Sequence, residues 1–388
     1  MAKENRKNLR GVGVNHKQTN GADPNMASLK DVASPVLFGT MANEELIDDD
    51  TGVIDSLLSS VIVTQSNMYA TGNKAKWRQL LPTNNVGDPW DSANYDFTIL
   101  DRHVQFCVDN NLGFKGHTLM WSRDDFPPND FNNIDTAARN DQITKHIDYV
   151  MSRYANSGVI AWDVWNEFVS TTDGGADDPF GTGLKNNPSF LEISVSDITL
   201  AFVSAQAADP NAILVANDFK NMGGNSRTDR MIGIIGQLLD DGAPISAVGF
   251  QAHVDLSPGG YQPTSSQIVS AFEAYTSSGV SCMVTELDIS VSNVTGTEAY
   301  KQQLQREYAE MLAYVCQTTS GVHSLSIWGL SDEHSWIYGR NDTTFAAGYP
   351  SEQPLPFGPT SSFCVAKPFF YGLSSGFLND PINPNSYT

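Results

Sequence analysis

Eight short apolar runs alternate with longer amphipathic stretches along most of this chain, and no other feature constrains its fold as strongly. Short apolar runs bounded by polar residues are typical of strands buried on both faces of a parallel sheet. The runs are Val36–Gly39, a segment near Val61–Ala70, Gly113–Trp121, Ala161–Glu167, Ile213–Asp218, Ala247–His253, Cys282–Asp288 and Ser324–Asp332.

The stretches between the runs have the spacing of helices. Asp135 stands where an N-cap is expected, and Gly279 stands where a helix commonly ends. The predicted helices are Asp96–Asn110, Asp135–Arg153, Ser189–Ala208, Arg227–Asp240, Ser265–Ser278 and Glu298–Gln317. Eight strands alternating with helices in a chain of 388 residues indicate an α/β fold, a single-domain (β/α)8 TIM barrel. A doubly wound open sheet is the alternative, but no G-x-G-x-x-G or P-loop follows the first strand.

The domain limits follow from the same pattern. Residues 1–34 are polar and rich in Asn, Lys and Gly, so we expect an N-terminal extension, with the barrel domain at 35–388. The longer insertions follow strand four (Phe168–Pro188) and strand eight (Glu333–Pro368). Loops after barrel strands lie on the carboxyl-terminal face, where such barrels keep their active sites.

Composition excludes several classes of function. The net charge is −21, from 44 acidic and 23 basic residues, which argues against nucleic acid or an anionic membrane as partner. Cys107, Cys282, Cys316 and Cys364 are widely spaced without a C-x-x-C pair, so a zinc site is not expected, and any disulfide cannot be paired from sequence. No long apolar run predicts a transmembrane helix, and the start MAKENRKNLRG is not a signal peptide.

Polar and indole side chains terminate six of the predicted strands. A single Glu at a strand end, such as Glu286, could be a structural acid paired with a cation, but six such ends on one barrel face predict a site. Glutamates, histidines, amides and tryptophans together are typical of a sugar-binding site, in which two carboxylates can flank a glycosidic bond. The residues are His117, Trp121, Asn166, Glu167, Asn217, Asp218, Gln251, His253, Glu286, Asp288, Trp328 and Asp332, with Trp336 just beyond.

These motifs resemble glycoside hydrolase family 10, the (β/α)8-barrel endo-1,4-β-xylanases. The resemblance rests on G-H-T-L-M-W at 116–121, W-D-V-W-N-E at 162–167, G-F-Q-A-H at 249–253, T-E-L-D at 285–288 and W-G-L-S-D-E-H-S-W at 328–336. It runs in order from about Phe38 to Gly372.

The resemblance implies a role for each matching residue. Glu167 would be the acid/base and Glu286 the nucleophile of a retaining enzyme, whose carboxyls lie about 5–5.5 Å apart. The charge on Glu286 would then raise the pKa of Glu167, while His253 would keep Glu286 ionised. The implied sugar contacts are Asn73, Lys76, His117, Trp121, Asn166, Gln251, His253, Trp328 and Trp336.

Departures from the family pattern concern specificity. The family's E-N-x-M-K-W reads G-N-K-A-K-W at 72–77, so the usual Glu is Gly72. The usual H-S-Q is Ser122-Arg123-Asp124, N-D-Y-N is Asn217-Asp218-Phe219-Lys220, and residues 337–352 form a longer insertion. The first two changes would alter the subsite one sugar toward the non-reducing end.

The leading hypothesis is a retaining endo-1,4-β-xylanase. The alternatives are a retaining β-glycanase of the same fold that acts on decorated xylan or β-glucan, and a non-catalytic carbohydrate-binding barrel. We expect a monomer that binds a polysaccharide and uses no cofactor, no metal, no nucleic acid and no membrane. A polymeric substrate cannot cross a membrane, so we also expect secretion, with the signal peptide absent from this sequence.

Overall fold

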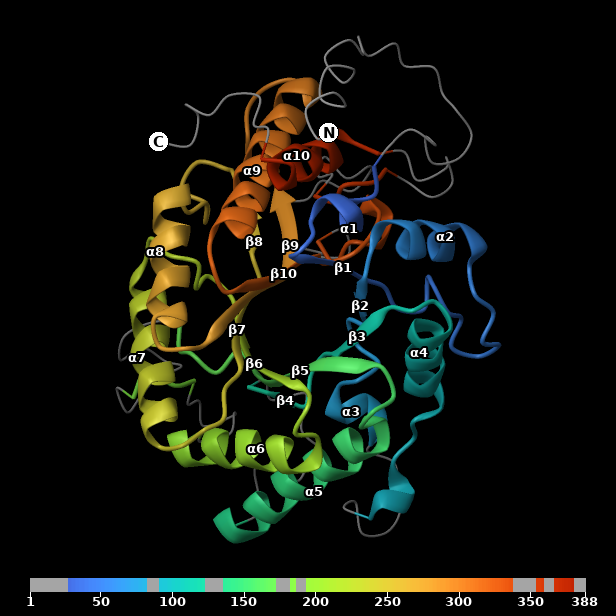
Figure 1. Cartoon of the computed structure of the whole chain (residues 1–388), viewed down its shortest axis with the longest axis vertical. Helices are drawn as coiled ribbons and strands as arrows, with labels where there is room; N and C mark the ends of the chain where they lie inside the picture. The colour runs from blue at the N-terminus through green and yellow to red at the C-terminus, as the bar shows by residue number, and fades with distance from the viewer. Residues whose placement is uncertain are drawn as a thin grey trace, which may run out of the picture.

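A closed parallel barrel forms the centre of the molecule in the computed structural model, which describes residues 27–81, 91–122, 135–171, 182–185, 193–337, 354–358 and 366–379. Its strands are β1 (Leu37–Met41), β2 (Met68–Ala70), β3 (Gly113–Gly116), β5 (Val159–Asn166), β6 (Ile213–Asp218), β7 (Ala247–Phe250), β9 (Ser281–Ser290) and β10 (Val322–Ile327). Each pairs in parallel with the next, and β10 pairs with both β9 and β1, which closes the ring. In Figure 1 the strands are seen arranged around the centre of the molecule. The predicted (β/α)8 barrel is therefore confirmed.

Helices surround the barrel (Figure 1). The predicted helices are present as α4 (Thr98–Asp109), α5 (Thr136–Tyr154), α6 (Val195–Ala208), α7 (Ser226–Asp240), α8 (Ser265–Thr276) and α9 (Glu298–Thr318). The Asp135 side chain accepts a hydrogen bond from the Ala138 N–H at 2.9 Å, as an N-cap should. Gly279 adopts a φ of +81°, which is the left-handed conformation expected after a helix.

The predicted strand near Val61–Ala70 is wrong in its first half. Residues 61–65 belong to α2 (Ser56–Gln65), and only Met68–Ala70 form a strand. The buried residues of α2 are Leu58, Val61, Ile62 and Gln65, which is the spacing of one helix face. A short apolar run fits a buried strand as well as the buried face of a helix, so the apolar character of this segment does not distinguish the two.

Four further helices were not predicted: α1 (Leu29–Val32), α2, α3 (Trp77–Leu80) and α10 (Pro368–Phe377). Helix α10 packs closely on α9 because Gly376 has no side chain, and a Cβ there would lie 2.2 Å from the Glu310 carbonyl oxygen. Leu29 of α1 is completely buried, so the chain already contacts the core there. Residues 1–26 of the expected extension lie outside the described residues, and the domain limits remain a prediction.

The barrel interior is partly apolar and partly charged. An apolar layer is formed by Met68, Ala161, Val215, Ala247 and Met283 from different strands.

Two short strands, β4 (Met120–Trp121) and β8 (His253–Asp255), extend the sheet by pairing with β5 and β9. They place Trp121 and His253 beside the carboxyl ends of the barrel strands. Among the described helices, none combines the length and the apolar character that crossing a bilayer requires.

Candidate active site

The two candidate catalytic glutamates lie at β5 and β9, which are separated in the ring by β6 and β7. Glu286 is within β9 and only 3% exposed. Glu167 directly follows β5 and has a φ of +58°, and its N–H donates to the Asn217 carbonyl at 2.9 Å. A left-handed conformation at a residue other than glycine costs about 1–3 kcal/mol and is characteristic of functional sites. The turn therefore fixes the direction of the Glu167 side chain.

Three amide side chains connect the two carboxylates. Asn217 Nδ2 donates to Glu286 Oε1 at 2.7 Å and to Asn166 Oδ1 at 2.9 Å. Gln251 Nε2 donates to the same Asn166 oxygen at 3.2 Å and to Glu167 Oε1 at 3.1 Å. We call Asn166, Asn217 and Gln251 the amide bridge. It holds the acidic groups of β5 and β9 in a fixed relation.

The amide bridge leaves one donor available. Asn166 is 1% exposed, and its oxygen already accepts two hydrogen bonds, which fixes the orientation of the amide. Its Nδ2 has no hydrogen-bond partner among the described residues. A buried unsatisfied donor costs about 1–3 kcal/mol. Such a group is suited to bind a ligand hydroxyl.

Glu286 lies in a strongly polarised environment. His253 places Nε2 3.3 Å from Glu286 Oε2 and Nδ1 2.9 Å from Asp288 Oδ2. Burial works against a charge on His253, but the carboxylates of Asp288 and Glu286 outweigh it and raise the pKa of His253 to about 10. Trp336 Nε1 donates to the same Asp288 oxygen at 2.6 Å. The cationic His253 therefore forms an ion pair with Glu286, the candidate nucleophile, and with Asp288.

Glu167 has a different electrostatic environment from the one expected. Burial favours its neutral form, but the Lys185 ammonium 3.3 Å from Oε2 and the hydrogen bond from Gln251 outweigh burial. They hold the pKa of Glu167 below its ordinary value. The expectation that Glu286 raises this pKa is therefore wrong for the free protein. The physical reason is Lys185, which the sequence patterns did not connect with Glu167.

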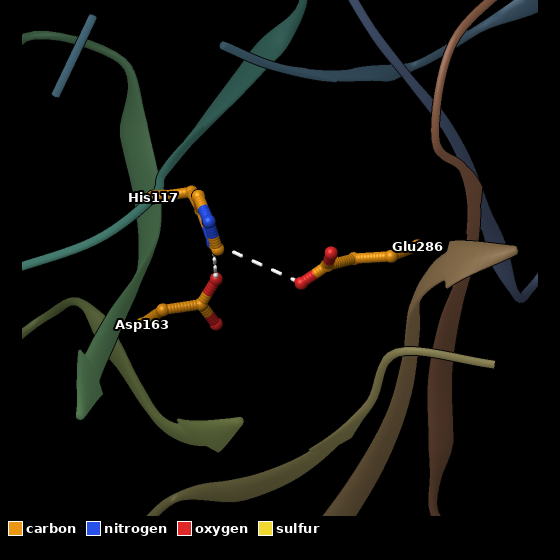
Figure 2. Close-up of side chains that lie close together, drawn as sticks. All are labelled: His117, Asp163 and Glu286. Atoms are coloured by element: carbon orange, nitrogen blue, oxygen red, sulfur yellow. Dashed lines mark hydrogen bonds and ion pairs between the residues drawn. The ribbon is translucent and has the colours of Figure 1, made fainter. Parts of the chain in front are cut away.

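His117 lies between Asp163 of β5 and Glu286 (Figure 2). Its Nδ1 is 2.8 Å from Asp163 Oδ2 and 3.9 Å from Glu286 Oε1. These three residues bring potential ligand atoms within 4.8 Å of one another, a spacing that a bound cation would require. Lys115 also contacts the Asp163 carboxylate and already supplies a cation there. A metal would have to compete with that ammonium, and the absence of a metal remains our prediction.

The remaining predicted sugar contacts line the same face. Lys76 Nζ donates a hydrogen bond to Asn73 Oδ1 at 2.8 Å, and it lies 4.3 Å from the Trp121 ring centroid. The Trp328 ring is 4.9 Å from His117, and the Trp336 ring is 4.9 Å from His253. Indole faces beside polar groups suit a pyranose ring, which has both apolar and hydroxyl-bearing surfaces. All eleven predicted site residues are linked by such contacts: Asn73, Lys76, His117, Trp121, Asn166, Glu167, Gln251, His253, Glu286, Trp328 and Trp336.

Two of the acidic strand-end residues have structural contacts. Asp218 forms a buried ion pair with Arg227 at 2.5 Å and accepts from the Val169 N–H. Asp332 forms a buried pair with Lys367 at 2.8 Å, which ties the chain after β10 to the start of α10. Conversely, the sequence identifies Asn217 only as the end of a strand. Its central position in the amide bridge depends on the strand register, which the sequence pattern does not give.

The departures from the family pattern are partly described. A Cβ at Gly72 would lie 2.9 Å from Asn43 Nδ2 and 3.0 Å from Met41 Sδ, so other side chains occupy that space. Ser122 Oγ accepts from the Trp165 indole N–H at 2.8 Å. Arg123, Asp124, Cys364 and most of the 337–352 insertion lie outside the described residues. Cys107, Cys282 and Cys316 are buried free thiols.

Comparison with known proteins gives a consistent result. The family model of glycosyl hydrolase family 10 matches residues 28–373. Endo-1,4-beta-xylanase C of Paenibacillus barcinonensis is 30% identical over 308 residues, covering 73% of this chain and 27% of that protein. Endo-1,4-beta-xylanase B of the same organism is 28% identical over 289 residues, covering 71% of this chain and 80% of that protein. A solved family 10 structure from P. barcinonensis superposes with a TM-score of 0.74 at 26% identity, covering 92% of this chain and 99% of that one.

Proposed function

Because this chain belongs to glycosyl hydrolase family 10, we propose that it is a retaining endo-1,4-β-xylanase, with Glu286 as nucleophile and Glu167 as acid/base. The similar proteins named endo-1,4-beta-xylanases support the substrate class. The observation that carries the assignment of residues is the amide bridge, which connects these two carboxylates within one buried network. A barrel that only binds sugar has no need of either carboxylate.

In the first step, an oxygen of Glu286 attacks the anomeric carbon of the sugar. The bond from this carbon to the glycosidic oxygen breaks, and that oxygen takes the proton of Glu167. The products are a glycosyl ester on Glu286 and a free chain end, while Glu167 becomes a carboxylate. His253 and Asn217 orient the Glu286 carboxylate for this attack through an ion pair and a hydrogen bond.

In the second step, water attacks the anomeric carbon of the ester. Glu167 now acts as base and takes a proton from this water, and the bond to Glu286 breaks. Both glutamates return to their starting state, and the product keeps the β configuration. The low pKa of Glu167 is favourable here because the residue must be ionised to act as a base.

The sugar beside the broken bond would bind to the polar groups of the same face. Asn166 Nδ2 would donate to the 2-hydroxyl, which satisfies its unpaired donor. Lys76 and Asn73 would bind hydroxyls on the non-reducing side, with Trp121 beside them. Trp328 and Trp336 would contact ring faces.

The Gly72 position favours a second candidate, a retaining β-glycanase with shifted specificity. The carboxylate usual in the family is missing there, and a Cβ at this position would already press on the ends of the Asn43 and Met41 side chains. A decorated xylan or a β-glucan would then be cleaved faster than plain xylan.

Product analysis separates these candidates. Xylan, arabinoxylan and β-glucan are digested separately, and the oligosaccharides are identified by mass spectrometry, with Glu286→Gln as the inactive reference. Short xylo-oligosaccharides from plain xylan support the first candidate, whereas cleavage confined to another polymer supports the second. Equal activity in Glu286→Gln would overturn both.

We also propose that the protein acts outside the cell, as a monomer. Polymeric xylan cannot enter a cell, so an enzyme that cleaves its internal bonds has to be exported. A native gene product found only in the cytoplasm would contradict export. A sedimentation mass above that of one chain would contradict the monomer.

A further inference from the structure

Lys185 is anchored beside the candidate acid/base by backbone contacts. Its N–H donates to the Phe168 carbonyl at 2.8 Å, and the neighbouring Leu184 forms an antiparallel bridge with Val169. Segment 182–185 therefore lies along the chain that directly follows Glu167. This places the lysine opposite the turn that aims Glu167.

The side chain of Lys185 completes the surroundings of the Glu167 carboxylate. Nζ lies 3.3 Å from Glu167 Oε2 and 5.0 Å from the Phe219 ring centroid, while Gln251 donates to Oε1. The Lys185 and Glu167 side chains are only 14% and 17% exposed, so water screens their attraction little. Both oxygens thus face donors. This arrangement suits a carboxylate, because the Lys185 ammonium and the Gln251 amide N–H both donate to it and neither accepts the proton of a carboxylic acid.

We propose that Lys185 is a positioning residue that biases Glu167 toward its carboxylate form, which confines efficient first-step catalysis to acidic pH and favours the second step. The inference rests on the proposed role of Glu167. The first step needs Glu167 protonated and the second needs it ionised, so a neighbouring cation assists one step at the expense of the other. The lowered pKa of Glu167 agrees with this geometry.

The other groups around Glu167 do not replace Lys185. Gln251 beyond β7 and Trp121 on β4 face the carboxylate but carry no charge. Asp218 at the end of β6 binds the Val169 N–H and is paired with Arg227. On the β8 and β9 side, Glu286 is paired with His253. Among the described residues, Lys185 is therefore the cation that pairs with the Glu167 carboxylate.

The test is the pH profile of kcat/KM for an unactivated xylo-oligosaccharide. This parameter reports the free enzyme and the first step, so its alkaline limb follows the ionisation of Glu167. Removing a cation at this distance should move that limb upward by about one pH unit or more in Lys185→Met. Lys185→Arg should keep the limb close to the original one. Lys145→Met, which removes a cation paired with Asp141 on the outer helix α5, is the matched control for net charge.

A second measurement needs no turnover. Carbon-13 NMR of the labelled glutamate carboxyls, with Glu167→Gln to assign the signal, gives the titration of Glu167 directly in the free protein. We expect its midpoint to rise in Lys185→Met and to stay in place in Lys145→Met. An unchanged midpoint overturns the inference about Lys185. Loss of the proposed function would instead appear as a wild-type protein that cleaves no β-glycan, whatever the titration shows.

Discussion

Asn217 offers a quantitative test of the amide bridge. It is completely buried, donates to Glu286 and Asn166, and accepts from the Thr285 hydroxyl at 2.7 Å. In Asn217→Ala, Glu286 loses a hydrogen bond to a charged group, which is worth about 1.5–3 kcal/mol. If the bond supports the transition state, kcat/KM falls roughly 10- to 150-fold at about 1.4 kcal/mol per factor of ten.

The assay compares kcat/KM of Asn217→Ala with that of Asn221→Ala. Asn221 is also completely buried, and its Nδ2 donates to the Gly249 carbonyl at 3.0 Å rather than to a glutamate. Both variants should lose stability, but only Asn217→Ala should lose catalysis to this extent. Gly249→Ala provides an independent perturbation, because its Cβ would lie 2.2 Å from Asn217 Oδ1 and displace the amide. Equal kcat/KM in the Asn217 and Asn221 variants would refute the reasoning.

Three further predictions concern stability, pH and specificity. Lys367→Met should lower the free energy of unfolding by about 3–5 kcal/mol, because it leaves the Asp332 carboxylate buried without its cation. Urea unfolding measures this change, and a variant as stable as the wild-type protein would contradict it. Adding Asp332→Leu to Lys367→Met should restore much of the lost stability. The pKa of His253 is raised to about 10, so its contribution is fully present below its unfolded value near 6.5 and is lost as pH rises through 10. The stability decline above pH 6.5 should be shallower in His253→Gln, and parallel curves would contradict this. Gly72→Glu alone should not improve hydrolysis of plain xylan, because the Cβ of the new residue would press on Asn43 and Met41, which would have to shift first. A marked fall in KM for plain xylan would contradict this.

The sequence predicted the fold and the site where chain order alone carries the information. An apolar run that ends in a polar group identifies the end of a buried strand, and closure of the barrel brings such ends together, as for Glu167 and Glu286. The pattern failed for α2, where the β-branched Val61 and Ile62 lie on a buried helix face. The pattern also identified Asp332 as a site candidate. In the structure Asp332 pairs with Lys367, which lies much later in the chain and could not be recognised as its partner from the sequence.

Contacts across the barrel could not be predicted in the same way. The position of Asn217 between Asn166 and Glu286 depends on the register of β5 and β6, in which Asn166 lies opposite Asn217. The ion pair of Lys185 with Glu167 depends on how segment 182–185 returns to the barrel. Neither residue type nor spacing determines such side-chain distances, so the lowered pKa of Glu167 is visible only in the structure.

Trapping the covalent intermediate would show directly whether Glu286 is the nucleophile. A 2-deoxy-2-fluoro xylobioside with an activated leaving group slows the second step, so the glycosyl ester accumulates and its peptide can be identified by mass spectrometry. We expect an adduct on Glu286 in the wild-type protein and none in Glu286→Gln. An adduct on another residue, or rapid turnover that yields the inverted anomer without any adduct, would contradict it.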